Sequence, residues 1–384
     1  MKSVSNYHFL KVDARKIILI LYCISLAMAM LQNSTFSYSR IFMVLRAIFM
    51  GIMLLISMIF CQKNYYEYGV LLIGFISTCK GLIQYPTTEL EYLYMIISFF
   101  CLSNVYPKKI LKYTMITMTV TLCIIYMAMK LGLIVNSVVY RDGIARQALG
   151  TNYPLTFASY IFFICAALTV LSNNTKKNNI LLSFLFLITA WILNSVTGAR
   201  NFSIAIILLA IIILIKKSIL LYGKALFFKI TICITLVLSL ISVFITKFIP
   251  YYSSTYYELN KLLSGRLSLQ YTLVNDYQPK LFGQYIYQST SRTGGYYFFI
   301  DSSYAKLIFI SGILFTILYY FIVIRQLFKL VDLNLYILVL VFIVILITGF
   351  VQGSAIGVSA NIFIPLLCVR ANLFEEDFKN NETI

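Results

Sequence analysis

The chain has 384 residues, of which 61% are hydrophobic and only 11% are charged, and its mean hydropathy is +0.88. A soluble domain carries about 25% charged residues, so this composition excludes a soluble globular enzyme and indicates a polytopic membrane protein. The net charge of +18 would suit nucleic acid, but no basic block lies in a soluble segment of domain size. We therefore expect membrane lipids as partners, and no nucleic acid.

Apolar runs predict about twelve membrane-spanning helices, because a span needs about 20 mainly apolar residues. In chain order the predicted spans are 17–32, 41–61, 67–85, 92–106, 113–135, 154–172, 180–196, 201–215, 225–249, 305–324, 333–350 and 353–369. The first, fourth, eighth and last are short, so the predicted count ranges from ten to thirteen. The expected fold class is therefore all-α, with residues 1–384 forming a single integral membrane domain.

Cations at one side of these spans predict the orientation of the chain. The first apolar run follows Lys2, Lys11, Arg15 and Lys16 without a clear cleavage site, which is typical of a signal anchor. With the N-terminus inside, every inner connection carries Lys or Arg, as the positive-inside rule requires. Both termini are therefore expected in the cytoplasm. The inner cations are Lys63, Lys108, Lys109, Lys112, Lys176, Lys177, Lys216, Lys217, Lys224, Arg325 and Lys329.

Two longer connections fall on the outer side. Residues 250–304 are too long and too polar for a hairpin, and their many aromatic residues argue against disorder. We expect a structured extracytoplasmic loop with one or two amphipathic helices on the membrane surface. Residues 136–153 form a second, smaller outer loop.

The outer half holds more cations than the positive-inside rule leads one to expect. It contains 13 cations and six acids, an excess of 13 − 6 = +7. Lys80, Lys130 and Lys247 taken singly are explained by snorkelling to the headgroups. The collective excess favours a basic, water-filled chamber for an anionic ligand. The 13 are Arg40, Arg46, Lys80, Lys130, Arg141, Arg146, Arg200, Lys247, Lys261, Arg266, Lys280, Arg292 and Lys306.

Several kinds of chemistry lack their usual residues. The eight cysteines lie in or beside apolar runs without clustering, and His8, the only histidine, lies in the inner N-terminal segment. We therefore predict no metal and no cofactor. The chain also has no Walker motif for ATP and almost no membrane-embedded carboxylate for proton coupling.

The segment "NSVTGARNFS" places Arg200 at the outer side, in a break between two apolar runs. Gly198 interrupts the first helix, and Asn201 or Ser203 could cap the next one. A guanidinium beside a helix N-terminus suits a phosphate group. The alternative is an ordinary interfacial anchor.

Three further outer segments are candidates for the same site. Arg266 opens an amphipathic stretch, 264–284, that Pro279 and Gly283 close; an ordinary surface helix is the alternative. Asp301 stands at the mouth of the span in 299–315, where Asp301 or Ser302 could instead be a helix cap.

The third segment, 140–157, carries Arg141 and Arg146 and ends at Pro154, which starts a span. Because Asp142 follows Arg141, this segment could also be a solvated turn.

The order of these motifs resembles the O-antigen ligase and Wzy-type polysaccharide polymerase superfamily. An outer Thr-Gly-Ala-Arg hairpin (197–200) precedes a large outer loop with Gly265-Arg266, an aromatic residue, Pro and Gly, which ends in Asp301-Ser302-Ser303-Tyr304. The similarity covers roughly residues 140 to 370.

This resemblance implies a metal-independent glycosyltransferase with a GT-C-like, all-helical fold. Its substrate would be an oligosaccharide on undecaprenyl diphosphate at the outer face of the bacterial cytoplasmic (inner) membrane, and the lipid diphosphate would leave. Arg200 and Arg266 would bind the diphosphate, and Asp301 is the expected polar partner or base, ahead of Asp142 and Asp276. The other expected substrate-binding residues are Arg141, Arg146, Arg292, Tyr271 and Tyr304.

Two departures refine the expectation. Ligases of this superfamily commonly have His-Asn-x-Tyr where this chain has Asp301-Ser302-Ser303-Tyr304, which favours a polymerase of capsule, O-antigen or exopolysaccharide repeat units over a ligase. In this superfamily a Trp usually follows the Gly-Arg motif, and Tyr271 stands near that position.

A flippase and a chain-length regulator are the expected protein partners. The alternatives are a ligase acting on another acceptor, or a flippase, which should show two similar halves that this chain lacks.

Overall fold

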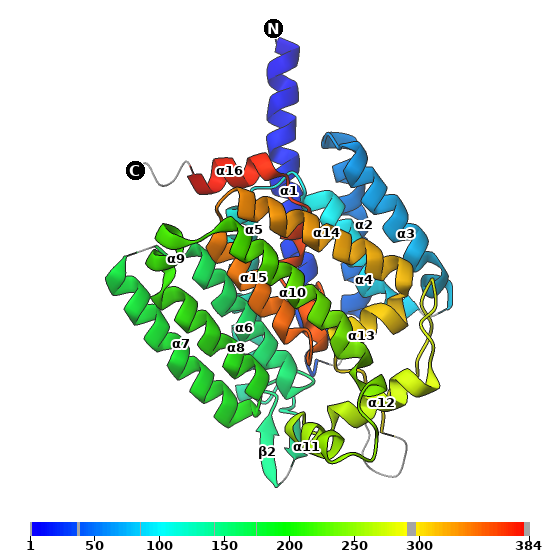
Figure 1. Ribbon diagram of the computed structural model, residues 1–384. Helices are drawn as coiled ribbons and strands as arrows, with labels where there is room; N and C mark the ends of the chain where they lie inside the picture. Colours follow the sequence, from blue (N-terminus) through cyan, green and yellow to red (C-terminus); the bar gives the residue numbers. More distant parts are fainter. Residues whose placement is uncertain are drawn as a thin grey trace.

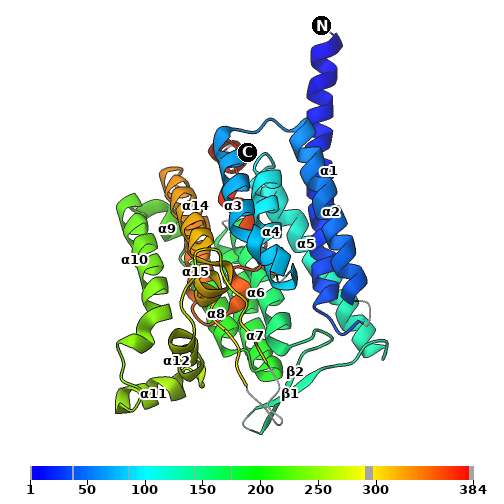
Figure 2. The same ribbon diagram turned by 90° about the vertical axis from the view of Figure 1, so that its right-hand side faces the viewer.

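The computed structural model describes residues 2–36, 39–84, 86–141, 143–173, 175–289 and 297–379, and most of them are helical (Figures 1 and 2). The N-terminal half has α1 (Lys2–Gln32), α2 (Ser39–Phe60), α3 (Tyr65–Gln84), α4 (Pro86–Leu102), α5 (Pro107–Lys130), α6 (Pro154–Leu171) and α7 (Lys176–Thr197). The rest has α8 (Arg200–Leu214), α9 (Lys216–Tyr222), α10 (Ala225–Phe244), α11 (Ser254–Leu262), α12 (Arg266–Asp276), α13 (Ser303–Lys306), α14 (Ile313–Asp332), α15 (Tyr336–Thr348) and α16 (Ala371–Lys379).

Seven helices of the described residues are long and apolar enough to cross a membrane, so the chain is a multi-pass membrane protein. An eighth span results if α8 and α9, which meet at a bend of 61°, are counted as one. The seven are Ala14–Gln32, Arg40–Phe60, Pro107–Lys130, Pro154–Leu171, Lys176–Thr197, Ala225–Lys247 and Ile313–Asp332.

The predicted count of twelve, with its range of ten to thirteen, is therefore wrong. The apolar parts of α4 and α15 are short helices, Leu90–Leu102 and Tyr336–Thr348, and α3 is not among the seven. The predicted span 353–369 holds only two short 3₁₀ turns, Gly353–Ala355 and Ile364–Cys368. An apolar run marks burial, and the runs of α4, α15 and 353–369 are buried against other helices without being long, regular spans.

The helices form one bundle whose two ends differ. Helix α1 packs against α2 and α5, α6 against α5 and α8, and α14 against α10 and α3. In both views the start of α1 and the C-terminal α16 lie at one end, whereas α11, α12 and the strands lie at the other (Figures 1 and 2). We call this second end the loop end.

The smaller predicted loop contains a short antiparallel hairpin of β1 (Val138–Arg141) and β2 (Ile144–Gln147), which the sequence did not predict. The larger loop contains two helices, α11 and α12, as predicted. Helix α12 buries Leu267, Leu273 and Val274, which fits the amphipathic stretch predicted over 264–284.

A pair of glycines fixes the larger loop to the bundle. Gly283 in the loop and Gly312 before α14 both have positive φ, 73° and 93°. A Cβ on Gly312 would lie 2.2 Å from the backbone nitrogen of Gly283, so only glycine fits there. The amides of Ile313 and Leu314 donate to the carbonyls of Lys280 and Leu281, at 3.0 and 3.1 Å. The loop backbone thereby satisfies the first free amides of α14.

Candidate active site

One large cavity opens at the loop end, with a volume of about 1310 Å³. It is lined by α12, α13, the first turns of α6 and α8, strand β2 and the irregular backbone of residues 351–360. Non-helical backbone inside a helix bundle is tolerated where it lines a cavity, because water or ligand can then satisfy its polar groups. The twelfth predicted span is thus one wall of this cavity.

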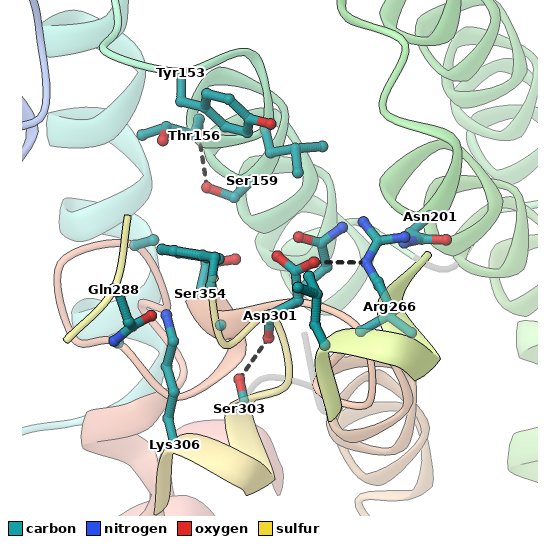
Figure 3. Close-up of a pocket in the computed structure, with 18 of the residues that line it drawn as sticks. Tyr153, Thr156, Ser159, Asn201, Arg266, Gln288, Asp301, Ser303, Lys306 and Ser354 are labelled. Carbon is teal, nitrogen blue, oxygen red and sulfur yellow. Dashed lines mark hydrogen bonds and ion pairs between the residues drawn. The ribbon is translucent and has the colours of Figure 1, made fainter. Parts of the chain in front are cut away.

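An ion pair joins the large loop to the mouth of α13. Arg266 Nε donates to Asp301 Oδ2 at 3.0 Å, and both side chains are partly buried (Figure 3). The Arg266 guanidinium also donates to the Leu263 carbonyl at 3.5 Å. The two partners are 35 residues apart in the chain, and the pair places a cation and a carboxylate side by side in the cavity.

Arg266 is held in place by the turn before α12. Ser264 and Gly265 both adopt positive φ, and the Gly265 amide donates to the Asn260 carbonyl at 2.8 Å. The Asn260 side chain accepts from the Ser268 amide at 3.0 Å, which ties the end of α11 to the start of α12. Arg266 is therefore the first residue of a helix whose entry angle is fixed.

Arg146 lies against the break between α7 and α8, and Arg200 follows this break. Gly198 ends α7 in the left-handed conformation, and Arg200 begins α8 with its side chain exposed along the cavity wall. A Cβ on Gly198 would lie 2.7 Å from Arg146 Nε, so the glycine makes room for the Arg146 guanidinium. Ser203 does not cap α8; its hydroxyl donates back to the Ala199 carbonyl at 3.2 Å.

The four residues 301–304 divide their roles. Asp301 faces the cavity, and Ser302 caps α13 by accepting from the Ala305 amide at 3.4 Å. The Ser303 hydroxyl donates to the Gln352 carbonyl at 2.5 Å, which fixes the irregular wall. Tyr304 is fully buried, and its hydroxyl donates to the Leu346 carbonyl at 2.7 Å, so it holds α13 against α15.

Lys306 brings a further cation into the cavity. Its Nζ lies 4.8 Å from the ring centre of Phe299 and packs against Gly353, where a Cβ would come within 2.5 Å of it. Burial lowers the pKa of the Lys306 ammonium below its usual value, and the Asp301 carboxylate acts in the opposite direction. Lys306 precedes the candidate span Ile313–Asp332.

The helical wall of the cavity holds a second ion pair. Arg46 on α2 is only 4% exposed and pairs with Glu91 on α4, and its guanidinium carbon lies 4.4 Å from the ring centre of Tyr94. Glu91 lines the cavity as well. Arg46 is thus not an unpaired outer cation. The two residues are 45 positions apart in the chain, so no local sequence pattern predicts their pairing.

The structure brings four of the predicted site residues together and leaves the others elsewhere. Arg146, Arg200, Arg266 and Asp301 line one cavity. Tyr304 and Tyr271 are not among the lining residues, because Tyr304 bonds to α15 and Tyr271 packs on Tyr251, with ring centres 4.6 Å apart. Asp276 is exposed at the end of α12, also away from the cavity. The Arg141 side chain, Asp142 and Arg292 lie outside the described residues.

Sequence reasoning missed the polar residues that complete the cavity. Lys306, Gln288 and Gln352 line it, but only Lys306 gave a signal, as one of the excess outer cations. Gln352 lies between two predicted spans, where nothing in its neighbourhood distinguishes it. No group of three His, Cys, Asp or Glu side chains that could hold a metal occurs among the described residues.

No known protein family, curated protein or solved structure matches this chain. The chemistry of the site therefore rests on its own geometry. Arg146, Arg200, Arg266 and Lys306 face two acids, Glu91 and Asp301, so the described lining carries a net charge of 4 − 2 = +2. Such a cavity attracts anions, and guanidinium groups bind phosphate oxygens well.

Proposed function

We propose that this chain is a polymerase of lipid-diphosphate-linked oligosaccharide repeat units, a metal-independent glycosyltransferase of the GT-C-like kind. The observation that carries the proposal is the meeting of Arg146, Arg200 and Arg266 with Asp301 in one cavity. This cavity lies at the loop end of an apolar helix bundle, where a substrate with a lipid tail and a charged diphosphate could reach it. Guanidinium groups bind diphosphates in a forked geometry that a lysine lacks.

In the proposed reaction a terminal sugar hydroxyl of one lipid-linked unit attacks the anomeric carbon of the glycan on a second lipid. A new glycosidic C–O bond forms, and the bond from that carbon to the diphosphate oxygen breaks. The electron pair leaves with the lipid diphosphate, whose growing charge Arg200 and Arg266 would stabilise. The hydroxyl proton passes to Asp301 or to water. Because a diphosphate is a good leaving group, the arginines matter more than the base.

The proposed setting is the outer face of a bacterial cytoplasmic membrane, with both termini in the cytoplasm. The two ends of the described chain lie at the end of the bundle opposite the cavity, which agrees with this orientation (Figures 1 and 2). A flippase would supply lipid-linked repeat units of capsule, O-antigen or exopolysaccharide, and a chain-length regulator would act on the product.

A reconstitution tests the proposal. The purified protein in lipid nanodiscs receives lipid-diphosphate repeat units from its own source cell, and the products are separated by size. A ladder of glycans that differ by one repeat unit is the expected result. Movement of the units across sealed vesicles without any ladder would instead indicate a transporter, and transfer to a different acceptor would indicate a ligase.

A further inference from the structure

We propose that the Lys306 side of the cavity is a subsite for an acidic sugar of the glycan, separate from the diphosphate site at Arg200 and Arg266. The sugar would carry a carboxylate, as a uronic acid does. This inference rests on the proposed function, because it assumes that the cavity holds a glycan. It adds a substrate class: repeat units that contain an acidic residue.

The two cationic parts of the cavity lie on different sides of Asp301. In Figure 3, Arg266 and Asn201 lie to one side of Asp301, and Lys306, Gln288 and Ser354 lie to the other. The Lys306 side chain extends from the end of α13 toward Gln288 and Ser354. A group bound at the Lys306 ammonium would therefore be a different part of the substrate from one bound at Arg266.

Within the described residues, the Lys306 ammonium has no ion pair and no hydrogen bond to a protein acceptor. The nearby Asp301 carboxylate is held by Arg266, at 3.0 Å. The ring of Phe299 attracts the ammonium on one side but does not neutralise it. A partly buried charge without a direct ion pair is costly, so an anionic group of the ligand gains binding energy there.

The neighbours of Lys306 suit the hydroxyls of a sugar. Gln288 accepts from the Ile300 amide through Oε1, at 3.1 Å, so its amide group is fixed in place with donors to spare. Gln352 is only 4% exposed, and its Nε2 has no partner among the described residues. Rotation of the Gln352 amide toward the cavity would let a ligand acceptor satisfy this donor, whose unsatisfied state costs about 1–3 kcal/mol. Ser354 and Ser359 add two hydroxyls to the same wall.

A single lysine favours a carboxylate over a second diphosphate. An ammonium is a compact point charge without the fork that binds two phosphate oxygens at once. It lies in a wall of amide and hydroxyl groups rather than among further cations. The chemistry of this wall therefore fits a ring with several hydroxyls and one negative charge.

The decisive experiment compares native and carboxyl-reduced repeat units. Lipid-linked units isolated from the source cell are treated so that each uronic carboxylate becomes a primary alcohol, and binding of both forms to the full-length protein in nanodiscs is measured. The wild type should bind the native unit about tenfold more tightly or better. Equal binding of the two forms, or a native unit without any acidic sugar, would overturn the subsite.

Variants assign the preference to Lys306. Lys306→Met should remove it and Lys306→Arg should keep most of it. Lys247→Met is the matched control, because Lys247 also lies over a phenylalanine, Phe244, but outside the cavity lining. A preference that survives in Lys306→Met contradicts the inference.

The result is separable from the proposed function. A Lys306-dependent preference without a glycan ladder would leave the acidic-sugar site and remove the polymerase. A ladder without any preference for the native unit would leave the polymerase and remove the acidic-sugar site.

Discussion

The ion pair between Arg46 and Glu91 differs most from the sequence-based prediction, in which Arg46 is one of the excess outer cations. A cation inside an apolar run is costly unless it is paired or hydrated, and the sequence offers almost no acid at the same depth. Glu91, 45 positions further on, nevertheless reaches it, and Tyr94 covers the guanidinium. The pair fixes α2 against α4 beside the cavity, so its role is to position helices.

Removal of one partner should expose this role. Glu91→Gln leaves Arg46 buried without a counterion, and we expect a loss of roughly 3 kcal/mol in the free energy of unfolding. Denaturant unfolding of the protein in detergent, followed by far-UV circular dichroism, measures this free energy. Asp332→Asn is the control, because the Lys229–Asp332 pair lies at the surface and is worth about 1 kcal/mol or less. Equal losses in both variants would contradict the assignment.

At the scale of elements, three breaks in helices shape the loop end. The left-handed Gly198 separates α7 from α8, Gly312 separates the π turn Leu307–Ser311 from α14, and residues 349–363 replace a span by irregular backbone. The first and third breaks line the cavity, and the Gly312 break holds the large loop. The bend between α8 and α9 differs, because there buried Lys216 donates to the carbonyls of Thr169, in α6, and Ser172, just after it, at 3.3 and 2.8 Å.

The contact between Gly283 and Gly312 is the element most sensitive to a single methyl group. Gly312→Ala places a Cβ against the Gly283 backbone at a positive φ, so the loop should detach from α14. We expect a destabilisation of about 2 kcal/mol or more and faster proteolysis of the 250–289 segment. Gly51→Ala is the control, because nothing lies within 4 Å of its Cβ and alanine favours the helix. Unchanged proteolysis in Gly312→Ala would show that the loop does not depend on this contact.

The same elements explain how much of the structure could be predicted. Long apolar runs such as 154–172 and 225–249 mark their helices because length and composition agree, and the Gly198 break is visible as a glycine between two runs. The 353–369 segment is just as apolar, but it is irregular because tertiary packing, not helix length, buries it. Arg266 and Asp301 were both predicted as site residues. Their pairing, and the inclusion of Gln352, depend on contacts across 35 or more residues that no local pattern records.

For the whole molecule, the orientation in the membrane can be tested with two matched positions. Tyr65 at the start of α3 and Tyr252 before α11 are both 96% exposed, and the proposed topology places them on opposite sides. In intact cells, an impermeant maleimide should label Tyr252→Cys and leave Tyr65→Cys unlabelled until the membrane is opened. The unsubstituted protein gives the background from its own cysteines. The reverse pattern would place the cavity in the cytoplasm and contradict the proposed function.

The polymerase proposal depends most directly on the arginines that share the cavity. The test is the length of glycan made from purified lipid-diphosphate repeat units by the wild type, by Arg200→Ala and by Arg266→Ala in nanodiscs. Lys261→Ala serves as the control, since Lys261 lies on α11 in the same loop but outside the cavity lining. We expect a ladder from the wild type and the control, and at least a hundredfold less polymer from each arginine variant. No ladder from the wild type, or a full ladder from both arginine variants, would contradict the account.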